Sequence, residues 1–79
     1  MYYTYILKSN KNGRYYIGYT ADINGRLSRH NSGVVAATKN FRPWVLFYNE
    51  KYDSENEAVR REKQIKSWKS RKAIEKLKF

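Results

Sequence analysis

Residues near the start of the chain alternate between two faces. Aromatic and β-branched side chains recur with a period of two over residues 2–8, a pattern typical of a β-strand. A polar cluster that ends in Asn12 and Gly13 follows, which indicates a hairpin turn. The alternation then resumes over residues 14–20. The sequence therefore predicts a β-hairpin.

The length of the hairpin turn decides which tyrosines share a face. If Asn12 and Gly13 form a two-residue turn, the sequence numbers of any two opposed residues sum to 25. Tyr5 then faces Thr20. Tyr16 then lies on the same face as Tyr5. Any loop with an even number of residues keeps this shared face, whereas an odd loop without a bulge reverses it.

Capping residues and helical spacing predict the next elements. Asp22 can cap a helix that ends near Ser32, and Gly33 can stop it. Arg26 and His30 lie four positions apart and flank the short apolar stripe of this helix. On its own, such a histidine is more often a surface or capping residue than a catalytic one.

Three further elements complete the chain. The nearly continuous apolar run that opens residues 44–52 predicts a third strand, either central in its sheet or covered on both faces. Ser54 and Glu57 form a capping box for a helix that runs toward Trp68. Ser70 can cap a last short helix.

The predicted order, β-β-α-β-α-α, defines the expected fold. We expect an α+β domain with a small three-stranded antiparallel sheet flanked by helices. The chain of 79 residues suits one such domain over residues 1–79.

Positive charge dominates the composition. The chain has 17 Lys and Arg against 7 Asp and Glu, a formal charge of +10, and such a surface attracts phosphate polymers. A membrane surface or a ribosome would be alternative partners. Aromatic residues make up 16% of the chain, which favours nucleic acid because phenol rings can stack on bases. Candidate contacts are Lys39, Arg42 and Lys66. We expect DNA as the partner, with RNA as the alternative, and no membrane.

The lack of cysteine narrows the chemistry. It excludes disulfides and thiolate metal sites and fits a reducing compartment, so that we expect a cytoplasmic protein. The first ten residues do not resemble a signal peptide. No stretch approaches the roughly 20 apolar residues that span a bilayer.

Glu62 is a carboxylate on a stripe that should face the core. Ala58 precedes it by four positions and Ile65 follows it by three. A buried carboxylate is costly unless it is paired or binds a cation, and Mg²⁺ often takes one or two carboxylates together with waters and phosphate oxygens. Spacing alone slightly favours an ion pair with one of the nearby cations: Arg60, Arg61, Lys63, Lys66 or, across the core, Arg26.

Several of these residues together resemble a known family. Tyr3-Thr4-Tyr5, followed eleven positions after Tyr5 by Tyr16-Ile17-Gly18, and then Arg26 and His30, resemble the GIY-YIG nuclease superfamily. Residues 60–68 resemble the later part of its small single-domain branch, which is similar to the amino-terminal nuclease domain of excinuclease C. The resemblance spans roughly residues 2 to 70. It implies a three-stranded antiparallel sheet with helices and metal-dependent cleavage of DNA phosphodiesters, as used in DNA repair or recombination.

The resemblance also implies roles for individual residues. Tyr5 would be the general base or would orient the attacking water, and Tyr16 would share its hydrogen-bond network. Arg26 would contact the scissile phosphate, and His30 would assist proton transfer or contact the phosphate. Glu62 would be the single ligand of one Mg²⁺ or Mn²⁺ ion. A tyrosine has an unperturbed pKa of about 10, and we expect the metal and the guanidinium to favour its phenolate.

Two departures from the family leave other functions open. Tyr3 and Thr4 stand where the family name implies Gly-Ile, and no asparagine follows Asn56, although many members have one near the active site. The alternative function is therefore a module of the same fold that binds nucleic acid without cutting it. A third hypothesis is a protein whose exposed tyrosines and last helix dock onto another protein.

Overall fold

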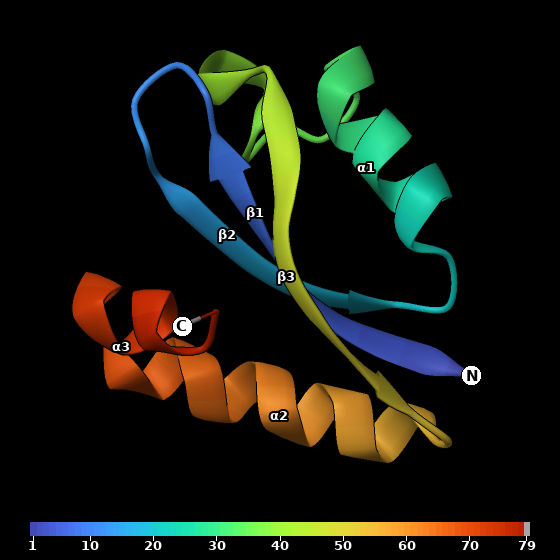
Figure 1. Ribbon diagram of the computed structural model, residues 1–79. Helices are drawn as coiled ribbons and strands as arrows, with labels where there is room; N and C mark the ends of the chain where they lie inside the picture. The colour runs from blue at the N-terminus through green and yellow to red at the C-terminus, as the bar shows by residue number, and fades with distance from the viewer. Residues whose placement is uncertain (79) are drawn as a thin grey trace.

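A computed structural model, which describes residues 1–78, has the predicted order of elements (Figure 1). These elements are β1 (Tyr2–Ser9), β2 (Tyr15–Thr20), α1 (Ile23–Ser32), the 3₁₀ turn η1 (Lys39–Phe41), β3 (Trp44–Tyr52), α2 (Glu55–Trp68) and α3 (Arg71–Lys76). The predicted α+β class is confirmed. Only η1 was not expected. Among residues 1–78, the structure has no helix of the length and hydropathy that crossing a membrane requires.

β1 is the central strand of the sheet. The strand order is β2-β1-β3, with both neighbours antiparallel to β1. Residues 4–7 of β1 are buried without interruption, as expected for a strand covered on both faces. The prediction that the third strand is central or doubly covered is wrong, because β3 is an edge strand on which Val45 and Leu46 are exposed.

The hairpin turn is longer than predicted. The Ser9 N–H donates to the Arg14 carbonyl at 2.8 Å and closes a turn of four residues. Tyr5 therefore pairs with Gly18, two positions from its predicted partner Thr20. The predicted register is wrong, but the shared face of Tyr5 and Tyr16 is confirmed, because both loop lengths are even.

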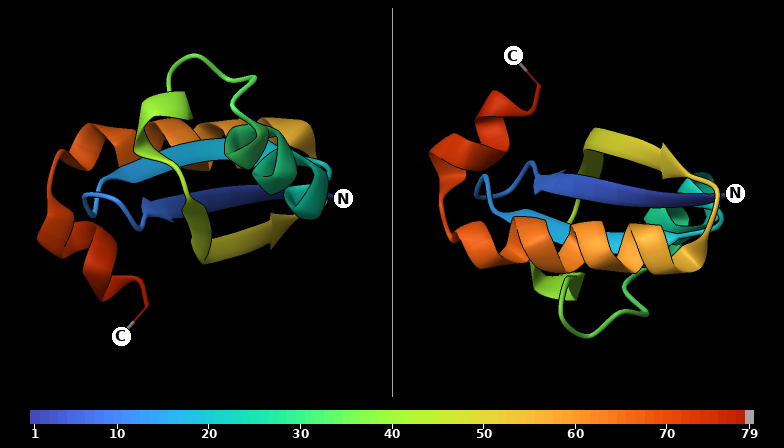
Figure 2. Two further views of the ribbon diagram at one scale, coloured as in Figure 1. Left: turned by 90° about the horizontal axis from the view of Figure 1, so that it is seen from above. Right: turned by 90° about the horizontal axis from the view of Figure 1, so that it is seen from below.

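The two faces of the sheet pack against different helices, and Figure 1 shows α1 and α2 on opposite sides of it. On one face, Tyr5 and Leu7 form a buried cluster with Trp44. On the other face, Ile6 packs against residues of α2 and α3, and α3 leaves the axis of α2 at an angle (Figure 2). The Thr4 hydroxyl donates to a carbonyl of α2 at 2.8 Å. Consecutive residues of β1 thus anchor the two layers.

The helices begin where capping residues predicted. Asp22, Ser54 and Ser70 each accept a backbone N–H three residues further on, at 3.1, 3.3 and 3.3 Å. The first helix ends at Gly33, whose φ of 87° is left-handed and suits a residue without a Cβ. Local chemistry therefore sets where all three helices begin and where the first one ends.

A polar cluster around Glu50 joins β3 to α2. The Glu50 carboxylate accepts hydrogen bonds from the hydroxyls of Tyr48 and Tyr52, both at 2.6 Å, and from Arg61 Nε at 2.8 Å. Burial acts to raise the pKa of Glu50, but the hydrogen bonds from Arg61 and the two tyrosines outweigh it and lower that pKa. Ionised Glu50 therefore stabilises the fold.

Glu50→Gln should lower the free energy of unfolding at neutral pH by about 2 kcal/mol, because charge-assisted hydrogen bonds are lost. A lowered pKa in the folded state gives stability that is present above the unfolded value of about 4.3 and is lost as pH falls through the folded value. The difference between wild type and variant should therefore shrink in acid. Urea unfolding at neutral and acidic pH measures it, and an equal difference at both would contradict the prediction.

Candidate active site

The side chain of Tyr5 lies across the backbone of β2. Tyr5 is 2% exposed and stands opposite Gly18. A Cβ placed on Gly18 would lie 2.6 Å from the Tyr5 hydroxyl oxygen and 2.8 Å from Cζ of its ring. Gly18 is thus the residue that leaves room for the phenol, and this explains a glycine in a strand where it otherwise weakens the sheet.

Gly18→Ala should displace the Tyr5 ring and destabilise the protein by about 1–3 kcal/mol, the usual cost of an extra methyl group in a packed site. Thermal unfolding measures the loss. Tyr5→Leu removes the atoms that clash, so the double variant should lose less stability than the sum of the two single variants. Additive losses would show that the methyl group at position 18 does not meet Tyr5.

His30 connects Tyr5 to the second layer. It is the buried residue of α1 and is 1% exposed, so it is not the surface histidine that spacing alone would favour. Its Nε2 lies 3.2 Å from the Tyr5 hydroxyl, and its Nδ1 lies 2.8 Å from Thr38 Oγ1. The ring of Tyr16 lies beside it, with centroids 4.8 Å apart. The structure thus brings together three of the predicted residues, Tyr5, Tyr16 and His30.

Burial keeps the Tyr5–His30 pair neutral. Desolvation and, next, Tyr16 raise the pKa of Tyr5 to about 12, Arg26 lowers it, and Glu62 adds to the rise. Desolvation, with Arg26 and Arg29, lowers the pKa of His30. Arg26 thus favours the phenolate, as expected, but burial outweighs it in the protein alone, and the expected effect of a metal ion stays a prediction. At neutral pH the site holds a phenol beside an uncharged imidazole.

Arg26 and Glu62 bring opposite charges toward Tyr5 from different elements. Arg26 is exposed on α1, one turn before His30. Glu62 belongs to α2, which packs against β2, the strand that the Tyr5 ring crosses. Both charges act on the pKa of Tyr5, so both lie within electrostatic reach of the phenol.

The predicted ion pair of Glu62 forms with Lys66. Lys66 Nζ lies 3.3 Å from Glu62 Oε2, and the Glu62 side chain is 14% exposed. Within residues 1–78, no three His, Cys, Asp or Glu side chains group in a way that could hold a metal ion. A single carboxylate still fits Mg²⁺, which keeps several waters and takes substrate phosphate oxygens. The Lys66 side chain is 52% exposed, and its role as a contact for nucleic acid stays a prediction.

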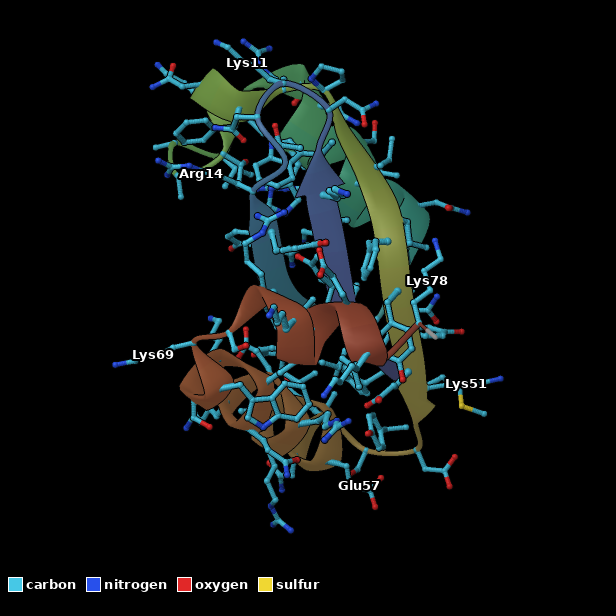
Figure 3. All side chains as sticks on the ribbon, turned by 60° about the vertical axis from the view of Figure 1, so that its left-hand side comes forward. Lys11, Arg14, Lys51, Glu57, Lys69 and Lys78 are labelled. Atoms are coloured by element: carbon cyan, nitrogen blue, oxygen red, sulfur yellow. The ribbon has the colours of Figure 1, made fainter. Side chains whose placement is uncertain are left out.

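The other two predicted nucleic-acid contacts lie at the C-terminal end of α1, where the Arg42 guanidinium packs against Gly33. Lys39 and Arg42 are exposed, and Arg42 Nε donates to the Lys39 carbonyl at 2.7 Å. Lys11 on the hairpin turn reaches the same segment, because its Nζ donates to a carbonyl of η1 at 3.0 Å. Figure 3 shows Lys11 and Arg14 at this end of the molecule and Glu57 at the opposite end. Basic residues therefore gather where the hairpin turn meets η1.

Sequence reasoning missed Thr38. This residue is 1% exposed within a stretch that reads as an irregular basic loop. No periodicity marks it, and its partner His30 is eight positions away. The residue type was the only indication in the sequence, because a threonine has no evident role in a basic loop.

Fold and site together define a small α+β domain with a tyrosine–histidine centre flanked by an arginine and a glutamate. Residues 1–77 match the model of the GIY-YIG catalytic domain. The chain belongs to the GIY-YIG family, a family of nucleases, and the resemblance of the sequence to it is confirmed.

Its relatives are proteins of similar size. UPF0213 protein SH2523 of Staphylococcus haemolyticus is 44% identical over 68 residues, which are 85% of this chain and 82% of the relative. UPF0213 protein SSP2268 of Staphylococcus saprophyticus is 42% identical over 74 residues, 92% of this chain and 89% of the relative. The solution NMR structure of UPF0213 protein BH0048 from Bacillus halodurans is similar, with a TM-score of 0.59, 35% identity and coverage of 98% of this chain and 82% of that one.

Proposed function

We propose that this protein is a divalent-metal-dependent endonuclease that hydrolyses DNA phosphodiesters, of the kind used in repair or recombination. The observation that carries the proposal is the 3.2 Å contact between the Tyr5 hydroxyl and His30 Nε2, within reach of the charges of Arg26 and Glu62. These groups supply a proton acceptor and charges that can stabilise the transition state of phosphodiester hydrolysis.

Tyr5 and His30 act as one base in this proposal. A phenolate is rare at neutral pH when the pKa is about 12, so Tyr5 takes a proton from the attacking water as its own hydroxyl proton passes to His30 Nε2. The water oxygen forms a bond to phosphorus, and the bond from phosphorus to the leaving oxygen breaks. That oxygen then takes a proton from solvent. Tyr16 packs against His30 and keeps its ring in place.

Arg26 and a metal ion held by Glu62 would offset the negative charge of the phosphate. The Arg26 guanidinium is exposed and can make two parallel hydrogen bonds to a phosphate while it keeps its charge. Glu62 would hold the Mg²⁺ or Mn²⁺ ion. When bound, such an ion lowers the pKa of water and offsets charge on the phosphate oxygens.

The test is cleavage of DNA by purified protein. Supercoiled plasmid and branched duplexes are incubated with Mg²⁺ or Mn²⁺, and a parallel series contains a chelator. We expect nicked or cut products that require the metal. If the metal-replete protein leaves all of these substrates intact, or cuts them equally well with chelator, the proposal fails.

A second candidate function is binding of nucleic acid without cleavage. The 3.3 Å contact of Lys66 with Glu62 favours it, because an ammonium already neutralises the carboxylate that would hold a metal. This function predicts affinity that persists after chelation and in Glu62→Ala. The absence of binding to DNA or RNA at low salt would eliminate it.

Lys39→Gln combined with Arg42→Gln should weaken DNA binding and reduce its salt dependence. Each phosphate contact contributes about 0.9 to the slope of log affinity against log salt for duplex DNA, so the double variant should lose up to about 2. Fluorescence anisotropy over a range of salt concentrations measures the slope. The matched control is Lys51→Gln, an exposed residue on β3 near the opposite end (Figure 3). An unchanged slope in the double variant would place the DNA elsewhere.

A further inference from the structure

The loop between α1 and β3 carries a threonine that is as buried as the core. Thr38 is 1% exposed, although Lys39 and Asn40 directly after it are exposed. Its Oγ1 lies 2.8 Å from His30 Nδ1, the ring nitrogen that faces away from Tyr5. The three side chains form one buried line from Thr38 through the imidazole to the phenol.

Two sets of hydrogen bonds hold Thr38 in this position. The indole Nε1 of Trp44 donates to the Thr38 carbonyl at 2.9 Å. The backbone of Trp44 is in turn fixed by Asn31, which accepts from its N–H at 2.7 Å and donates to its carbonyl at 2.9 Å. Because Asn31 directly follows His30 in α1, the helix that carries the imidazole also fixes the loop that carries its partner.

The Thr38 hydroxyl has a second neighbour. It points at the Val35 carbonyl, with an oxygen–oxygen distance of 3.4 Å. A carbonyl can only accept, so a hydroxyl that donates to Val35 must accept from His30. The proton of the neutral imidazole then sits on Nδ1, and Nε2 offers a lone pair to the Tyr5 hydroxyl.

We propose that Thr38 is a positioning residue that holds His30 in the Nδ1–H tautomer, so that Nε2 can accept the proton of Tyr5. In the other tautomer, Nε2–H would donate to the phenol oxygen, and the imidazole could not take a proton from it. The catalytic consequence rests on the proposed nuclease function, whereas the tautomer itself does not.

The protein offers a direct measurement, because His30 is its single histidine. Long-range proton–nitrogen NMR spectra of the ¹⁵N-labelled protein at about pH 8, where an imidazole is neutral, report which ring nitrogen carries the proton. We expect Nδ1–H in the wild type and in Thr38→Ser, which keeps the hydroxyl. Thr38→Val keeps the shape but lacks the hydroxyl, and we expect it to shift the population toward Nε2–H.

Kinetics then separate a positioning role from a packing role. If the protein cleaves DNA, Thr38→Val should lower kcat by roughly 10-fold to 100-fold with little change in KM, because general base catalysis is impaired and substrate contacts are not. Thr38→Ser should restore most of the loss. Wild-type protein in the Nε2–H form would overturn the proposal even if no variant folded, and so would an unchanged tautomer in Thr38→Val. A tautomer shift in a protein that cuts no DNA would reject the nuclease function and keep the role of Thr38.

Discussion

Tyr5→Phe should reduce the rate of metal-dependent DNA cleavage by about 10²- to 10⁴-fold, the contribution expected of a general base. The substitution removes only the hydroxyl that lies 3.2 Å from His30 Nε2. The ring stays in its place across Gly18, so the sheet and the buried cluster with Trp44 should persist. Single-turnover cleavage at saturating protein measures the chemical step without a contribution from product release.

The matched control is Tyr19→Phe. Tyr19 is on β2 and pairs with Thr4, so its side chain lies on the face opposite Tyr5. Loss of its hydroxyl should leave cleavage unchanged. Thermal unfolding of both variants checks that each is folded, because a neutral hydrogen bond contributes only about 1 kcal/mol. A Tyr5→Phe protein that is folded and cleaves at the wild-type rate would remove Tyr5 from the reaction.

The sequence was sufficient to predict which residues of the hairpin share a face, but it did not predict which residues pair across the hairpin. Tyr5 and Tyr16 share a face for every even loop, so the period-two pattern was sufficient. The exact partner of Tyr5 depends on which polar groups close the turn. Ser9 accepts backbone N–H bonds through its side chain from Lys11 and Asn12, which stabilises a longer turn than the Asn12-Gly13 signal indicates.

Strand order was misjudged for a similar reason. An apolar run such as that of β3 indicates burial, but it does not say which strand lies between the other two. β1 takes that place because both neighbours pair with it. The aromatic residues of β3 that are partly covered, Phe47 and Tyr48, pack toward the α2–α3 layer, while Val45 and Leu46 remain exposed at the edge. Tertiary arrangement overrode the local pattern.

The histidine environment shows where sequence reasoning ends. Spacing placed Arg26 and His30 on one helix, but burial of His30 depends on Thr38 and Trp44, which come from an irregular loop and from β3. A contact between a helix and an irregular loop produces no periodic pattern in the sequence, so periodicity cannot predict it. The core-facing stripe of Glu62 was visible in the sequence, because its helical neighbours Ala58 and Ile65 are regular and are both buried.

Glu62→Gln should lower the cleavage rate at least about 10²-fold, since it removes the carboxylate proposed to hold the ion that offsets phosphate charge. Removal of this charge should hardly affect the fold. The partner Lys66 is 52% exposed, and such i,i+4 pairs contribute only about 0.3–0.5 kcal/mol. The matched control is Glu57→Gln, an exposed carboxylate in the first turn of the same helix, which should cleave normally.

The weakness of the Lys66–Glu62 pair also bears on the two candidate functions. An ion pair of about 0.5 kcal/mol lowers the affinity of a competing cation by little more than twofold. A modest concentration of Mg²⁺ can therefore displace Lys66 from Glu62. Lys66→Gln should then reduce the metal concentration for half-maximal cleavage by about twofold, as a metal titration of the cleavage rate would measure. If Glu62→Gln instead retains wild-type cleavage and its metal dependence, Glu62 is not the ligand, and its pairing with Lys66 is its role.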